Sequence, residues 1–113
     1  MSKDLQSNYI DKEAMHGAQN YSPLPVVLKK GDGVYLWDVN DKKYLDMMSA
    51  YSAVSHGHSH PELVETLVNQ SKKLAIASRA FYTEPLANYI EKLSKLSGFT
   101  SVLPMNTGAE AVA

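Results

Sequence analysis

The chain has 113 residues, enough for one small domain, and its 44% apolar and 20% charged residues are ordinary for a soluble globular protein. The formal net charge of −1 provides no electrostatic basis for binding nucleic acid or an anionic membrane, and the absence of cysteine excludes disulfides and thiolate chemistry. No apolar run approaches the roughly 20 residues of a membrane span. The N-terminus has no apolar signal segment, so the cytoplasm is the expected location.

The first part of the chain predicts a helix followed by a small antiparallel sheet. Residues 4–15 carry an imperfect apolar stripe that is typical of a helix. A loop is expected over residues 17–25, because its glycine and two prolines exclude regular structure. Residues 26–48 predict a three-stranded meander, with turns at Gly31-Asp32-Gly33 and at Asn40-Asp41.

Two tyrosines in irregular segments are candidate binding residues. Tyr21 lies in the predicted loop, and Tyr51 lies in the small-residue run Ser49–Val54, where small side chains permit close approach of a ligand or of another chain. Binding residues concentrate on loops that a scaffold holds in place. The alternative is a structural tyrosine with its ring packed beneath the loop and its hydroxyl in water, and the local pattern alone favours that alternative.

Three histidines alternate in the segment before the next helix and raise the question of a metal site. In an extended strand His56, His58 and His60 would share one face. Gly57 and Pro61 favour a turn instead, with Pro61 at the first position of a helix. No cysteine or suitably spaced carboxylate accompanies the histidines, so we expect a structural role rather than metal binding.

The second part of the chain predicts two amphipathic helices and then the start of an α/β unit. Residues 61–75 and the segment from Thr83 onward each place apolar side chains on one face. Between them, Arg79 is a candidate anion ligand, although pairing with a structural acid is favoured. Phe99–Leu103 predicts a buried strand, and the alanine-rich segment after Thr107 predicts a helix. This order indicates an appendage that leads into a larger layered domain.

The turn before the last helix is a candidate phosphate site. The spacing of Thr107 and Glu110 predicts a capping box. The start of a helix presents free N–H groups at the positive end of its dipole, where phosphate binds, and Gly108 has no Cβ to obstruct the approach. Many such turns carry Thr and Gly only to cap the helix, and the local pattern alone favours that simpler role.

Four separated blocks resemble the ornithine aminotransferases, a class III, pyridoxal-phosphate-dependent family of fold type I. The blocks are Gly17–Tyr21 with Pro23–Val26, Ser49–Val54, Ser78–Tyr82 and Leu103–Val112. They match in order, at the expected spacing, from about residue 14 to the end of the chain. Two positions depart from the family pattern: Gln19 stands where the family commonly has His, and His56 where it commonly has Gln.

The resemblance implies an α/β fold with a small antiparallel meander, two helices, and the first strand and helix start of the large domain. Residues 1–51 would be the N-terminal segment with the meander, and residues 52–113 the beginning of the large cofactor-binding domain, truncated. Family members are homodimers or higher oligomers with the active site at the subunit interface. No nucleic acid, membrane or metal is implied.

The activity that the resemblance implies is transfer of the δ-amino group of L-ornithine to 2-oxoglutarate. The products are glutamate and glutamate semialdehyde, which cyclises to pyrroline-5-carboxylate. Thr107, Gly108 and Ala109 match the loop that holds the phosphate of the pyridoxal 5′-phosphate cofactor. Tyr21 and Tyr51 match tyrosines that line the ornithine pocket, where Tyr21 would bind the α-amino and carboxylate end.

Much of the family's catalytic machinery has no counterpart in this sequence. Missing are the lysine that forms a Schiff base with the cofactor, the aspartate beside the pyridine nitrogen, the aromatic side chain stacked on the ring and the arginine that binds glutamate. The chain therefore contains no catalytic residue of the family, and alone it is expected to be inactive. We interpret it as the front part of a longer protein, because a domain does not normally end where a helix has just begun.

The sequence leaves two alternatives open. One is a sister class III enzyme that acts on acetylornithine or 4-aminobutyrate, which the tyrosine blocks disfavour. The other is a freestanding, non-catalytic domain, which would have to bury the apolar faces of its helices within 113 residues. Small domains do this with difficulty, so we expect exposed apolar surface and a molten or aggregated state for the chain alone.

Overall fold

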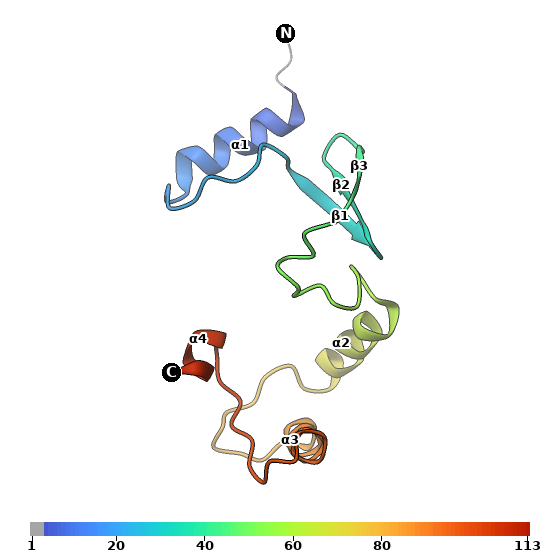
Figure 1. Ribbon diagram of the computed structural model, residues 1–113, viewed down its shortest axis with the longest axis vertical. Helices are drawn as coiled ribbons and strands as arrows, with labels where there is room; N and C mark the ends of the chain where they lie inside the picture. The colour runs from blue at the N-terminus through green and yellow to red at the C-terminus, as the bar shows by residue number, and fades with distance from the viewer. Residues whose placement is uncertain (1–3) are drawn as a thin grey trace. The chain divides into compact units, whose positions relative to one another are not determined.

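A computed structural model describes residues 4–113, which contain four helices and three strands (Figure 1). The chain divides into two compact units, one ending at Gln70 and the other beginning at Ser71. Each unit is described by itself below. The expected boundary at residues 51 and 52 concerns the domains of a whole enzyme and stays a prediction.

Helix α1 (Leu5–His16) confirms the first predicted helix. It ends where the N–H of Gly17 donates to the carbonyl oxygen of Glu13 at 2.7 Å, and Gly17 itself is extended. The side chain of Gln6 ties the helix to the next segment, because its Oε1 accepts from the N–H of Val27 at 2.9 Å. These contacts place α1 beside the segment that leads into the sheet.

The predicted meander is confirmed as one antiparallel sheet of β1 (Leu28–Asp32), β2 (Tyr35–Asp38) and β3 (Lys43–Leu45), in that order. Its second turn, at Asn40-Asp41, is where the sequence predicted it, and Asp41 takes a left-handed φ of 66° there. The first turn is displaced from its predicted position. Asp32 still pairs with Tyr35, so the turn consists of residues 33 and 34.

A close tertiary contact explains why Gly31 belongs to the strand and not to the turn. A Cβ at Gly31 would lie 2.7 Å from the Cβ of His58, closer than real side chains approach. Gly31 therefore gives room for His58 beside β1, whereas Gly33, with φ 55°, provides the turn conformation. The sequence pattern of two nearby glycines does not distinguish these two roles.

Asp38, only 1% exposed, is the hydrogen-bond centre of the β2–β3 turn. Its Oδ1 accepts from the N–H groups of Asn40 and Lys42, at 2.9 and 3.0 Å, and its Oδ2 accepts from the hydroxyl of Tyr44 at 2.8 Å. Burial raises the pKa of Asp38, but these hydrogen bonds outweigh burial and leave the pKa below its ordinary value of 3.8. The hydrogen bond between Tyr44 and Asp38 also raises the pKa of Tyr44, since Tyr44 donates to a carboxylate.

The turn at Asp38 is expected to weaken in acid. A lowered carboxyl pKa contributes stability that is fully present above the ordinary value and is lost as the pH falls through the folded pKa. Carboxyl ¹³C NMR of the full chain should give a titration midpoint for Asp38 below 3.8, and Tyr44→Phe should raise it. A midpoint at or above the ordinary value, unchanged by Tyr44→Phe, would contradict this description of the turn.

The predicted helices of the second part are confirmed as α2 (Pro61–Lys73), α3 (Glu84–Ser97) and α4 (Gly108–Val112). Gly98 ends α3 in the left-handed conformation, with φ 77°. The predicted strand at Phe99–Leu103 is wrong, because this segment forms no strand and both of these end residues are exposed. A buried parallel strand needs neighbouring strands, and the described residues contain no strand beside this run.

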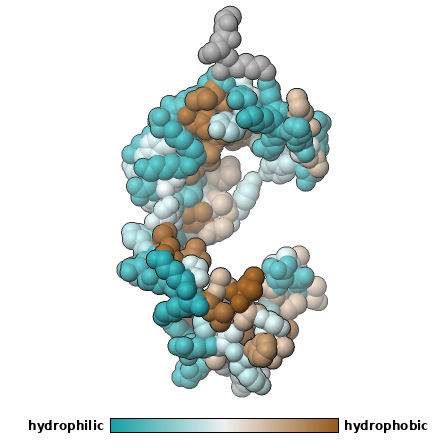
Figure 2. Space-filling model, turned by 180° about the vertical axis from the view of Figure 1, so that it is seen from behind, coloured by the Kyte–Doolittle hydropathy of each residue, from teal (hydrophilic) through white to brown (hydrophobic). Residues whose placement is uncertain are grey.

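Apolar side chains lie at the surface throughout the described residues. None of the apolar side chains of residues 4–113 is buried. The three strands, all in the first unit, are the only helices or strands among these residues that pack directly on one another. Figure 2 shows apolar residues (brown) gathered on the surface drawn there. The expected exposure of apolar surface is thus confirmed. None of the described helices combines the length and apolar character needed to span a membrane.

Candidate functional site

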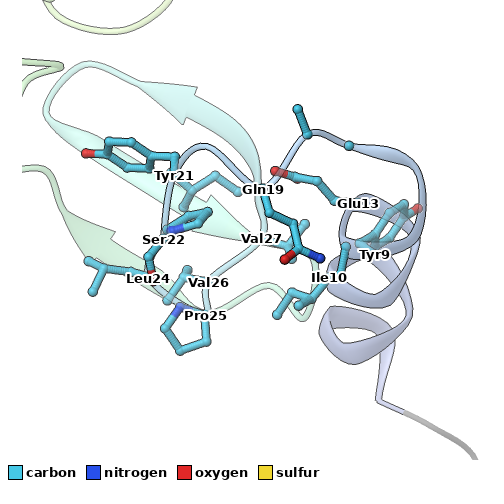
Figure 3. Close-up of a pocket in the computed structure, with 15 residues that line it drawn as sticks. Tyr9, Ile10, Glu13, Gln19, Tyr21, Ser22, Leu24, Pro25, Val26 and Val27 are labelled. Carbon is cyan, nitrogen blue, oxygen red and sulfur yellow. The ribbon is translucent and has the colours of Figure 1, made fainter.

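A groove of about 580 Å³ lies between α1 and the segment that follows it (Figure 3). Ile10 of α1 and Val27 of the following segment both line it, whereas the ring of Tyr21 extends away from α1. The groove is formed because the prolines of residues 17–25 keep this loop extended along the helix. Tyr21 therefore lies at the rim of the groove, with its ring extending beyond it.

The structure brings together the two tyrosines that the sequence singled out. The hydroxyl oxygens of Tyr21 and Tyr51 lie 3.3 Å apart, although the residues are 30 positions apart in the chain. Their side chains are otherwise accessible, at 73% and 78% exposure. Each hydroxyl has one donor and two acceptor positions, so the pair keeps capacity for a further polar ligand. Such a pair can accept from an ammonium group and donate to a carboxylate.

The electrostatic state of Tyr51 follows from this contact. The hydrogen bond with Tyr21, together with a smaller effect of burial, raises the pKa of Tyr51 above its ordinary value of 10.0. Tyr51 is therefore a neutral phenol at neutral pH and retains its proton for hydrogen bonding. A neutral hydroxyl pair suits a zwitterionic ligand, because it adds no charge of its own to the site.

Tyr51 is presented by an unusual left-handed turn. Ser49, Ala50, Tyr51 and Ser52 have φ values of 48°, 45°, 55° and 76°. The turn is closed by N–H donation from Tyr51 to the carbonyl of Met48 at 3.0 Å. A left-handed conformation costs about 1–2 kcal/mol for each non-glycine residue, and such strain concentrates at functional sites. No glycine marks these four positions, so the sequence offered no sign of the turn.

The capping box predicted at the start of α4 is confirmed. Thr107 Oγ1 accepts from the N–H of Glu110 at 3.2 Å, and Glu110 Oε2 accepts from the N–H of Thr107 at 2.9 Å. The N–H groups of Gly108 and Ala109 have no acceptor among residues 4–113. A Cβ at Gly108 would meet nothing within 4 Å. Two open N–H groups and free space fit a phosphate, which accepts several hydrogen bonds.

The candidate residues therefore fall into two groups that belong to different compact units. Tyr21 and Tyr51 meet in the first unit, and Thr107, Gly108 and Ala109 form one turn in the second.

The histidine segment forms hydrogen bonds with nearby side chains. His58 bonds to Asp46, and His56 Nδ1 lies 3.0 Å from the hydroxyl of Ser55. His60 is the residue before α2, and its carbonyl accepts from Val64 at 3.0 Å. In the part of the chain that the structure describes, no group of three or more His, Asp or Glu side chains is placed to hold a metal ion.

The Asp46–His58 pair is the feature that the sequence did not indicate. Its members are 12 residues apart and come from the end of the sheet and from the histidine segment. The alternation of histidines drew attention to a possible metal site, but no local pattern connects His58 to a particular carboxylate. Only the tertiary fold brings these two side chains together.

Comparison with known proteins identifies the family to which this chain belongs. Residues 16–113 match the profile of the aminotransferase class-III family, so the chain belongs to the class III aminotransferases. Members of this family depend on pyridoxal phosphate. The fold agrees with the expectation, since the chain corresponds to the N-terminal part of a fold type I pyridoxal-phosphate-dependent transferase.

Several individual proteins of known name are similar to most of this chain. The chain is 57% identical over 99 residues to the mitochondrial ornithine aminotransferase of Drosophila melanogaster, covering 88% of this chain and 23% of that protein. Among solved structures, the ornithine δ-aminotransferase of Plasmodium falciparum is 48% identical, with a TM-score of 0.91 over 95% of this chain and 28% of the other. The acetylornithine aminotransferase of Elizabethkingia anophelis is 59% identical, with a TM-score of 0.92 and the same coverage. The chain thus spans about a quarter of the length of these relatives.

Proposed function

We propose that this chain acts as part of an ornithine δ-aminotransferase, an enzyme that transfers the δ-amino group of L-ornithine to 2-oxoglutarate. The observation that carries the proposal is the contact of 3.3 Å between the hydroxyls of Tyr21 and Tyr51. The products are glutamate and glutamate semialdehyde, which cyclises to pyrroline-5-carboxylate. Ornithine aminotransferases are among the relatives that cover most of this chain, which supports the proposal.

The tyrosine pair has the chemistry to hold the end of ornithine that must not react. Phenol oxygens accept from the α-ammonium group, and a phenol proton donates to the carboxylate. With Tyr21 on that end, the flexible side chain of ornithine extends toward the reaction centre and presents its δ-amine. Selection between two chemically similar amines then depends on orientation.

The proposed cofactor is pyridoxal 5′-phosphate, with its phosphate held by Thr107, Gly108 and Ala109. The open N–H groups of Gly108 and Ala109 donate to the phosphate oxygens. Thr107 Oγ1 already accepts from Glu110, so its proton remains available for a further hydrogen bond. When bound, the cofactor supplies the electron sink for amine transfer, and the protein supplies binding and orientation.

We also propose the substrates, the oligomeric state and the cellular location of the enzyme. The substrates are small molecules, L-ornithine and 2-oxoglutarate, and the active enzyme is a homodimer or a higher oligomer. We place it in the cytoplasm, although the Drosophila relative is named as mitochondrial.

A second candidate is transfer from N-acetylornithine, favoured by the 59% identity to the structure named as an acetylornithine aminotransferase. Acetylation converts the α-ammonium into a neutral amide and adds bulk beside the tyrosine hydroxyls. A hydrogen bond to a charged group contributes about 1.5–3 kcal/mol, so its loss corresponds to roughly a tenfold to hundredfold preference for ornithine. The open, polar character of the Tyr21–Tyr51 pair favours the free amino acid.

A chimera tests the proposal directly. In it, this chain replaces the matching residues of the Drosophila melanogaster ornithine aminotransferase, and the parent enzyme serves as the control. We expect the chimera to bind pyridoxal phosphate, as seen in its absorbance, and to form pyrroline-5-carboxylate from ornithine. Its kcat/KM for ornithine should exceed that for N-acetylornithine by at least about tenfold. Equal or better use of N-acetylornithine by a cofactor-loaded chimera would favour the second candidate.

A further inference from the structure

The carboxylate of Asp46 bridges two parts of the first unit. Its Oδ1 accepts from the N–H groups of Met48 and Ser49, at 3.0 and 2.8 Å, which are the residues that enter the left-handed turn. Its Oδ2 lies 2.6 Å from Nε2 of His58. The Asp46 side chain is 8% exposed and that of His58 21%, so the bonds to Ser49 and His58 are partly shielded from water, whereas the bond to Met48 lies at the surface. One carboxylate thus holds the start of the turn and a histidine at the same time.

His58 is itself fixed to the sheet. The backbone N–H of His58 donates to the carbonyl of Gly33 at 2.8 Å, and the backbone carbonyl of His58 accepts from the N–H of Gly33 at 3.0 Å. Its ring lies against Gly31, where a Cβ would be in steric conflict. The hydroxyl of Ser59 adds a bond of 3.0 Å to the carbonyl of Gly31. The N–H of Asp46 also donates to the carbonyl of Val34 at 2.9 Å, so His58 fixes the carboxylate of Asp46 relative to a hairpin that its backbone already contacts.

The left-handed turn needs such support. Four successive non-glycine residues with positive φ persist only when the surrounding structure determines their conformation. The bonds from Met48 and Ser49 to Asp46 restrain the first step of the turn, and the Tyr51 side chain lies three residues beyond Met48. We propose that Asp46 and His58 are positioning residues, which hold this turn and thereby place the hydroxyl of Tyr51 against that of Tyr21.

The consequence for substrate binding rests on the function proposed above. Without the anchor, Tyr51 moves away from Tyr21, and the hydroxyl pair no longer holds the α-ammonium and carboxylate end of the amino donor. The affinity for the amino donor then falls, because the hydrogen bonds to its charged groups are lost. The acceptor, 2-oxoglutarate, has no α-ammonium group, so its binding depends less on the tyrosine pair.

Fluorine NMR reads the position of Tyr51 independently of any substrate. With 3-fluorotyrosine at position 51 of the chimera, the pKa of the phenol should lie above that of the free amino acid, because Tyr21 bonds to it. His58→Leu removes the donor to Asp46 and should return the pKa to the free value. His58→Gln keeps an N–H donor near the Nε2 position and should retain the raised pKa, at least in part. His56→Leu, a matched change in the same segment, should have no effect.

Kinetics of the same variants test the consequence for the reaction. We expect His58→Leu to raise the KM for ornithine about tenfold, with kcat and the KM for 2-oxoglutarate changed less than twofold, and His58→Gln to restore most of the affinity. A merely structural histidine would instead lower the melting temperature and the yield of active enzyme, and reduce both half-reactions alike.

The outcomes separate this inference from the proposed function. An unchanged phenol pKa in His58→Leu would overturn the positioning role, whatever the substrate is. A normalised pKa together with an unchanged KM for ornithine would keep the positioning role and contradict the proposed part of Tyr51 in ornithine binding. Both effects together would support both.

Discussion

The isolated chain is expected to show no sharp cooperative unfolding transition and no transaminase activity. The inactivity follows from the missing catalytic residues of the family. The broad transition is expected because none of the apolar side chains of residues 4–113 is buried, so loss of tertiary structure exposes little additional apolar surface. Cooperative unfolding depends on such a core, as does the heat capacity change that accompanies it. The strands of the meander are the elements that pack on one another, and we expect their local hydrogen bonds to persist.

Three measurements check this expectation on the purified chain. Thermal and urea unfolding followed by circular dichroism should be broad. A dye that binds exposed apolar surface should fluoresce strongly in the presence of the chain, as it does with molten states. Formation of pyrroline-5-carboxylate from ornithine should be below detection. A sharp, concentration-independent melt of a monomer would contradict the account and favour a freestanding domain.

Replacement of Tyr21 by Phe in the chimera is expected to weaken selection of ornithine strongly. The change removes one hydroxyl and leaves the ring, so packing in the groove is preserved while the partner of the Tyr51 hydroxyl is lost. A hydrogen bond to a charged group contributes about 1.5–3 kcal/mol, which corresponds to roughly a tenfold to hundredfold loss in kcat/KM for ornithine. Because N-acetylornithine lacks the α-ammonium, its kcat/KM should change much less.

A matched variant separates the loss of this hydroxyl from a general effect of tyrosine replacement. Tyr9 lines the same groove from α1, but the hydroxyl that bonds to Tyr51 is that of Tyr21, so Tyr9→Phe should leave selectivity unchanged. The comparison uses the ratio of kcat/KM for the two donors, which cancels differences in the amount of active enzyme. If Tyr21→Phe left this ratio unchanged, Tyr21 would not bind the α-amino end.

Local patterns predicted most of the elements because each has a local physical cause. The apolar stripe of α3 and the left-handed Gly98 after it define that helix without reference to the rest of the molecule. The capping box of Thr107 and Glu110 was predicted from spacing alone for the same reason. The blocks containing Tyr21 and Tyr51 indicated candidate site residues through the family resemblance, and the structure then brought their hydroxyls together.

The features that the sequence did not reveal depend on distant contacts. The strand expected at Phe99–Leu103 has the composition of a buried strand, but a strand also requires a hydrogen-bonded neighbour. Gly31 resembled a turn residue, yet it is small because His58 packs against it. The left-handed turn at Tyr51 likewise depends on Asp46 and on the hairpin that holds His58. Such relations cannot be recognised from neighbouring residues in the chain.

In the function proposed for this chain, the Tyr21–Tyr51 pair directs the δ-amine, and not the α-amine, of ornithine to the reaction centre. The most direct test supplies the chimera with ornithine carrying ¹⁵N only at the δ position, together with unlabelled 2-oxoglutarate, and measures the glutamate by mass spectrometry. We expect the newly formed glutamate to carry the label, because the tyrosine pair retains the α-amino end. Unlabelled glutamate formed at a comparable rate would show that the α-amine reacts, which would contradict the proposed role of the tyrosine pair.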